Sequence, residues 1–121
     1  MAQERAVGWW CVTEEDLQDL DAVRARDLVI RCFFEAHKET YAAAKAKLGV
    51  PTGEEEVHRS IVAAVRLAFR EVGADFDHPT KEALTQVIEV LARKAAAWGT
   101  PKEVVEHHKG EIRKVLARLE G

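Results

Sequence analysis

Three histidines and one tyrosine fall on predicted apolar helix faces, and they are the residues of this sequence best placed to carry chemistry. His37, Tyr41, His58 and His108 are each reached from apolar neighbours by steps of three or four residues, the spacing that keeps residues on one face of a helix. Imidazole nitrogens from different helices of a bundle hold transition metals, and a tyrosine oxygen can complete the ligand set. We therefore predict that the four side chains converge, and one hypothesis is a divalent transition-metal site for zinc or iron.

Two other interpretations of these residues stay open. Buried histidines and a tyrosine can form a hydrogen-bonded network without any ligand, or the same layer can line a small-molecule pocket. A di-iron centre is disfavoured, because it needs a pair of Glu-x-x-His motifs and the sequence contains only Glu55-x-x-His58. We assign no catalytic residue and no cofactor-binding residue, and the four residues named above are candidate metal ligands only.

Glycine and threonine residues divide the chain into the helices that must position these side chains. Gly49, Gly73 and Gly99 suit the left-handed position that ends a helix. We predict helices over about residues 14–48, 53–72, 80–98 and 101–119. Because the connections are short, neighbouring helices must run antiparallel. The sequence therefore predicts an all-α, up-down-up-down four-helix bundle.

The predicted helix starts carry recognisable capping signals. Thr52-Gly-Glu-Glu55 and Thr100-Pro-Lys-Glu103 match the capping box, in which a threonine hydroxyl accepts from the backbone amide three residues later. We expect Thr52 and Thr100 to cap the second and fourth helices in this way. The first helix is expected to start within Thr13 to Asp16, and the third within Asp77 to Thr80.

The first predicted helix would overhang its neighbours by about 15 residues. This overhang carries Leu17 and Leu20, shortly after Trp9 and Trp10, and apolar surface of that extent is rarely left in water. We expect these four side chains to be mostly buried. Either the chain breaks near Asp19–Asp21 and folds back over the bundle end, or the segment packs on another chain, as in a homo-oligomer.

Length and composition set the remaining limits. The chain has 121 residues, enough for one domain, and we divide it into an apolar N-terminal segment, 1–13, and a single bundle domain, 14–121. A net charge of −3 disfavours nucleic-acid binding, and no apolar run reaches the length of a membrane span.

The cysteine content and the lack of a complete catalytic set lead to a prediction of location and function. Cys11 and Cys32 are the only cysteines, and we interpret them as reduced thiols in a cytoplasmic protein, with a disulfide between them as the alternative. We predict a non-catalytic interaction or oligomerisation module. The alternative is a transition-metal-binding bundle, acting as a sensor or an oxidoreductase.

Overall fold

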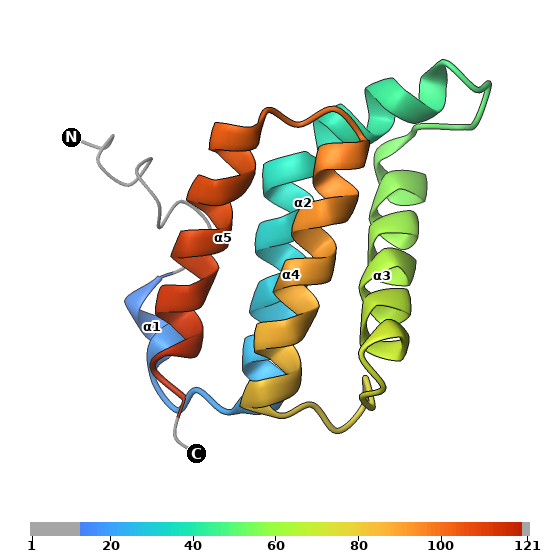
Figure 1. Ribbon diagram of the computed structural model, residues 1–121. Helices are drawn as coiled ribbons and strands as arrows, with labels where there is room; N and C mark the ends of the chain where they lie inside the picture. Colours follow the sequence, from blue (N-terminus) through green and yellow to red (C-terminus); the bar gives the residue numbers. More distant parts are fainter. Residues whose placement is uncertain (1–12, 120–121) are drawn as a thin grey trace.

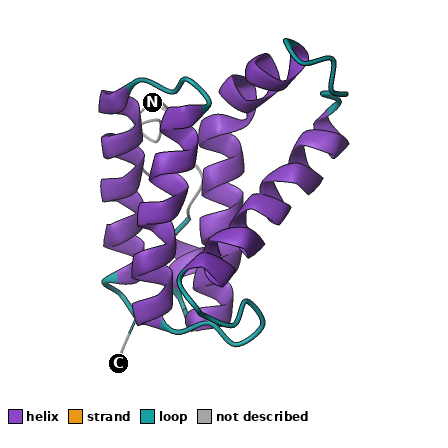
Figure 2. Cartoon of the chain, turned by 45° about the vertical axis from the view of Figure 1, so that its right-hand side comes forward, coloured by secondary structure: helices purple, strands orange, loops and turns teal. Residues whose placement is uncertain are grey.

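The chain forms a bundle of antiparallel helices. The structure, a computed structural model, describes residues 13–119 (Figure 1). The elements in chain order are α1 (Glu14–Leu17), α2 (Ala22–Ala46), α3 (Glu54–Glu71), α4 (Lys81–Ala97) and α5 (Lys102–Leu116). Residues 13–119 contain no β-strand, so the prediction of an all-α bundle is confirmed (Figure 2).

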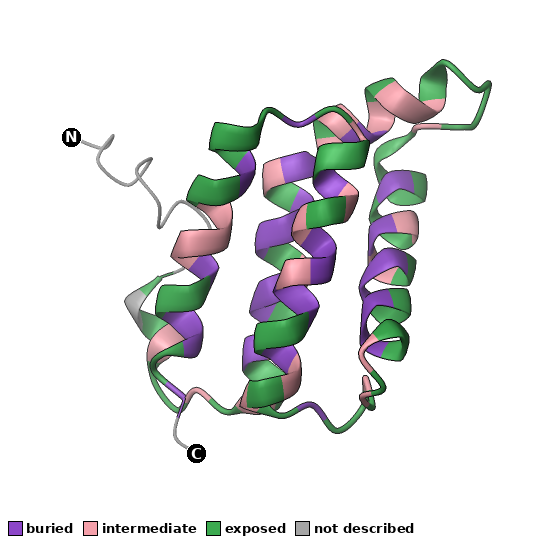
Figure 3. Ribbon diagram, in the orientation of Figure 1, coloured by how far each residue is buried: buried purple, intermediate pink, exposed green. Residues whose placement is uncertain are grey.

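The four long helices pack around the contact between α2 and α4. α2 contacts α3, α4 and α5, and α4 contacts α3 and α5 as well. α2 and α4 therefore form the central diagonal, with α3 on one side and α5 on the other (Figure 1). Buried residues line the facing sides of these helices (Figure 3). The most completely enclosed large side chains include Phe69, Ile61 and Leu84.

Three glycines end the long helices, as the sequence predicts. Gly49, Gly73 and Gly99 have φ angles of 76°, 73° and 104°. The same two backbone bonds recur at each: the glycine amide donates three residues back, and the next amide donates five residues back. This is the Schellman arrangement, which satisfies the last carbonyls of a helix. One local rule therefore sets three of the helix ends.

The predicted capping boxes of the second and fourth helices are wrong. α3 begins after Gly53 and α5 after Pro101, and neither start has a side-chain cap. The Thr100 amide instead donates to Ala95 O at 3.1 Å as part of the Schellman closure of α4, so Thr100 belongs to the end of one helix rather than the start of the next. Thr80 caps α4 through a 3.1 Å bond from the Ala83 amide, within the range that we predicted.

The chain breaks between residues 17 and 22, which corrects the continuous first helix of 14–48. Thr13 and Asp16 form a reciprocal capping box on α1, Asp19 has a φ of 53°, and Asp21 caps α2.

The short helix that results folds back onto the bundle. Leu17 and Leu20 are half-buried and pack against the core, and Asp16 forms an ion pair with Arg31 of α2. For these two leucines, folding back is what the structure shows. Trp9 and Trp10 lie outside the described residues.

Cys32 lies deep in the bundle, with 1% of its surface exposed. It is disulfide-bonded, so the prediction of a reduced thiol at this position is wrong. Cys11, the other cysteine in the sequence, lies outside the described residues. Separately, no helix among residues 13–119 is long and apolar enough to cross a membrane.

Candidate functional site

His37 of α2 and His108 of α5 face each other in the bundle interior. Their ring centroids are 5.5 Å apart, and the rings are close to perpendicular, at 85°. His37 is only 3% exposed, and its ring also lies 4.8 Å from that of Phe33. His37 is buried because it follows Phe33 and Val29 by steps of four on the inward face of α2.

A chain of hydroxyl groups orients His37. Thr40 Oγ1 donates to the His37 carbonyl at 3.1 Å and lies 2.9 Å from Thr100 Oγ1, which is 3.3 Å from His37 Nδ1. A hydroxyl carries one proton. Because the Thr40 hydroxyl already donates its proton to the carbonyl, it accepts the hydrogen bond from the Thr100 hydroxyl. Thr100 Oγ1 must then accept from His37 Nδ1–H. In neutral His37 the proton therefore lies on Nδ1, and Nε2 is an acceptor.

Burial keeps both histidines neutral at pH 7. The pKa of His37 is lowered from 6.5 to about 4, first by desolvation on burial and second by electrostatic repulsion between the protonated forms of His37 and His108. The pKa of His108 is lowered first by burial and then by His107, against the opposing effect of Glu111. Neutral imidazoles can accept a proton, share a hydrogen bond or ligate a metal.

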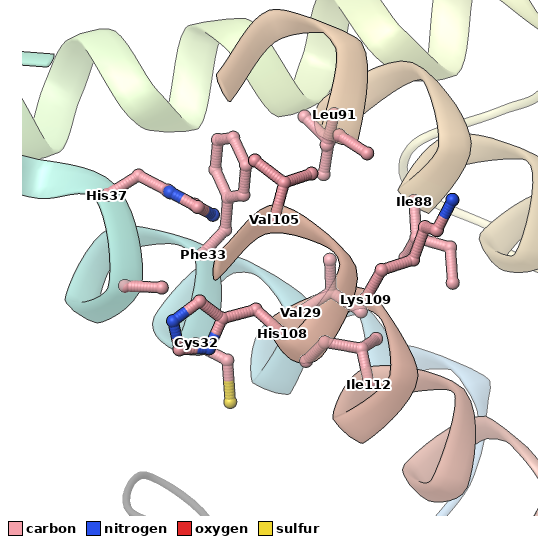
Figure 4. A pocket seen from close by; sticks show the side chains of 12 residues that line it. Val29, Cys32, Phe33, His37, Ile88, Leu91, Val105, His108, Lys109 and Ile112 are labelled. Atoms are coloured by element: carbon pink, nitrogen blue, oxygen red, sulfur yellow. The ribbon is translucent and has the colours of Figure 1, made fainter. Parts of the chain in front are cut away.

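The two histidines line a small cavity between α2, α4 and α5 (Figure 4). The rings of His37 and His108 lie on one side of it, and Ile88 and Lys109 on the other (Figure 4). The lining is otherwise mostly apolar, and the volume is about 30 Å³. A cavity of this size holds a water molecule or two and no organic substrate, so it does not support the interpretation as a small-molecule pocket.

An ion-pair group closes the cavity on the α4–α5 side. Lys109 Nζ lies 3.2 Å from Glu89 Oε1 and 3.4 Å from Glu106 Oε2, and Arg113 also bonds Glu89. Burial alone would raise the pKa of Glu89, but hydrogen bonds from Lys109 and Arg113 hold it below its ordinary value. The apolar stem of Lys109 lines the cavity while its ammonium group reaches these carboxylates.

The other two predicted site residues lie elsewhere. Tyr41 is buried, but its ring packs at 4.7 Å against Trp98. His58 is exposed on α3, with its ring 5.0 Å from Phe34. The inward face of α3 runs through Val57 and Ile61, and the residue after Val57 is turned by about 100° from that face.

His58 therefore does not join His37 and His108, and the predicted cluster of three histidines is not formed. Among residues 13–119, no group of three or more His, Cys, Asp or Glu side chains could hold a metal ion. The structure brings His37 and His108 together, and adds two residues that our sequence analysis did not place there. Thr100 was assigned to a cap, and Thr40 carried no signal beyond lying three residues after His37.

A second surface feature lies between α2, α3 and α4, and we call it the α3 groove. α3 is inclined to the other long helices (Figure 2). The groove has a volume of about 500 Å³, and its lining residues are Tyr41, Lys45, Ser60, Ala63, Ala64, Leu67, Lys94, Ala97 and Trp98. Leu67 is 48% exposed, and Trp98 is half-buried beside Tyr41. The volume is in the range of ordinary binding sites.

Comparison of the chain with protein-family models, with curated proteins and with solved structures finds no match.

Proposed function

We propose that this protein is a non-catalytic interaction module and that its binding surface is the α3 groove. The observation that carries the proposal is the exposed Leu67, which lies in one groove with the aromatic pair Tyr41 and Trp98. Large apolar and aromatic side chains in a concave surface are typical of the anchor positions of protein interfaces.

The proposed partner is a protein. A net charge of −3 disfavours binding to nucleic acid, which requires cations to displace the counterions of phosphates. The sequence pattern predicts a homo-oligomer contact through Trp9, Trp10, Leu17 and Leu20. The two leucines pack on the core of their own chain, which directs the proposal to the α3 groove instead.

Selection of displayed helical peptides on the full chain tests the proposal. Enriched peptides should lose at least about tenfold in affinity for Leu67→Glu, because a carboxylate in the groove would have to be desolvated. Val104→Glu is the matched control, since Val104 is an exposed valine on α5 and α5 does not line the groove. Equal losses for both variants, or no loss for Leu67→Glu, would contradict the proposal.

The metal-binding alternative retains two adjacent candidate ligands, His37 and His108. Structural zinc takes four ligands as a rule, so a metal here would need donors beyond this pair. Elemental analysis of protein purified without an affinity tag tests this alternative. Stoichiometric zinc or iron that is lost in a His108→Leu variant would support it, and metal-free protein would count against it.

The proposed cytoplasmic location is tested by the state of Cys32. Disulfides are rare in the reducing cytoplasm, whereas Cys32 is disulfide-bonded in the structure. Trapping of free thiols by alkylation at the moment of cell lysis decides the point. Alkylated Cys32 supports a cytoplasmic protein, and an intact disulfide supports an oxidising compartment.

A further inference from the structure

The α3 groove also carries information about the chemistry of its partner. We infer that it binds an amphipathic helix whose apolar face is flanked by carboxylates, an inference that rests on the proposed function. The charge of the lining residues, the dimensions of the groove and the state of the surrounding backbone each support this partner.

The charges at the groove are positive. Its lining contains two cations, Lys45 and Lys94, and no acidic residue. Lys45 lies over the Tyr41 ring, with Nζ 5.4 Å from the ring centroid, and no carboxylate within residues 13–119 forms an ion pair with it. Lys94 Nζ lies 3.3 Å from Glu71, a carboxylate that is 51% exposed. Such a surface pair is weak, so a partner carboxylate can compete for Lys94.

The dimensions of the groove suit two turns of a helix. On α3 the lining runs from Ser60 to Leu67, a rise of about 10 Å at 1.5 Å per residue. The walls include Ala63 and Ala97, whose small side chains allow another helix to approach closely. A partner helix can therefore place apolar side chains at positions i, i+3 or i+4, and i+7 against Tyr41 and Trp98.

The backbone around the groove favours a helix over an extended peptide. The groove is bordered by α2, α3 and α4, whose backbone amides and carbonyls bond within their own helices. An extended peptide would find no sheet edge to pair with, and its own polar backbone would be left to water or unpaired. A helix brings its backbone hydrogen bonds with it. A nucleic acid would find two cations and an apolar floor, which is a poor match for a row of phosphates.

Two synthetic helical peptides with one apolar face test the inference. Both carry leucine and phenylalanine at the anchor positions; one has glutamates on both flanks of that face and the other has lysines. Fluorescence anisotropy of the labelled peptides on the full chain should show the glutamate peptide binding about tenfold tighter at low salt, with the difference shrinking as salt rises. The double variant Lys45→Glu/Lys94→Glu should reverse the preference.

The control is Lys102→Glu/Lys114→Glu, two exposed lysines of α5 outside the groove, and it should keep the preference for glutamate. If both peptides bind the wild-type chain equally and neither binds the Leu67→Glu variant, the preference for a carboxylate-flanked helix is refuted. The proposal that the α3 groove is a binding surface would then still hold. If neither peptide binds, the inference is refuted, and the displayed-peptide selection decides the proposed function separately. If sedimentation shows a dimer that Lys45→Glu/Lys94→Glu dissociates, the occupant is a second copy and the inference is refuted.

Discussion

Acidification should destabilise this protein chiefly through His37. The imidazole is 3% exposed, and its pKa falls from the ordinary 6.5 to about 4. Between these two values the unfolded chain binds a proton at His37 that the folded chain does not bind. Unfolding therefore takes up a proton, and stability falls as the pH falls. The stabilisation is complete above pH 6.5 and is lost by about pH 4.

The size of the effect follows from the pKa difference. At about 1.4 kcal/mol for each pH unit, the full loss is about 3 kcal/mol. About 2 kcal/mol of this loss should already be seen between pH 7 and pH 4.5. Carboxylates begin to protonate at the lower end of this range, and a variant that lacks only His37 shares their contribution. This is a large share of the 5–15 kcal/mol that is typical of a folded domain.

Urea unfolding followed by circular dichroism measures the loss directly. The variant His37→Asn keeps an amide nitrogen near the position of Nδ1 and so can still donate to Thr100, but it does not titrate. Its overall stability will be lower because the ring contacts with Phe33 and His108 are lost. The difference in unfolding free energy between wild type and His37→Asn should shrink by about 2 kcal/mol from pH 7 to pH 4.5.

One other histidine serves as a reference. The effect of His78 on stability has the opposite pH dependence, because its hydrogen bond to Asp75 raises the pKa of the imidazole. Its stabilising contribution is present at low pH and is lost as the pH rises. Parallel pH profiles for wild type and His37→Asn would refute the argument from buried His37.

Three further outcomes are expected. Thr100→Val should cost about 1–3 kcal/mol in urea unfolding, because it leaves buried polar groups unpaired, whereas Thr100→Ser should stay close to wild type; equal costs would rule out the hydroxyl network. Reduction of the disulfide at Cys32 should lower stability by about 2–4 kcal/mol. Alkylation of the denatured protein before reduction, followed by peptide mass spectrometry, should leave Cys32 unmodified. Gly110→Ala lies in the interior of α5 with open space around a new Cβ and should stabilise the protein by about 0.5–1 kcal/mol. Gly99→Ala, at a φ of 104°, should destabilise it by more than that. Melting temperatures that shift in the same direction for both variants would contradict this reasoning.

Features that depend on a few neighbouring residues could be predicted from the sequence. Gly49, Gly73 and Gly99 end their helices because a left-handed residue closes the last turn whatever packs beside it. The break near Asp19–Asp21 was one of two predicted outcomes, since the exposed leucines had to be covered either by their own chain or by another. The antiparallel bundle followed from the short connections between helices.

The candidate site could be predicted only in part. Helical spacing identified His37 and His108 as inward-facing, and they meet across the bundle. The same reasoning placed His58 with them, but the inward face of α3 is centred on Val57 and Ile61. A face defined by spacing is uncertain by about one residue, and one residue turns a side chain by about 100°. Only the packing of α3 against α2 and α4 decides which side is covered.

Thr100 shows where local sequence and tertiary structure compete. Its hydroxyl had two possible partners: the backbone amide three residues later, which the local motif Thr100-Pro-Lys-Glu103 indicates, and the groups that α2 presents across the bundle. The amino-acid sequence by itself determined where the helices end and which faces are apolar, because those properties arise within one or two turns. The tertiary structure decided that Thr100 turns to Thr40 and His37, because a buried imidazole needs a hydrogen-bond partner that its own helix cannot supply.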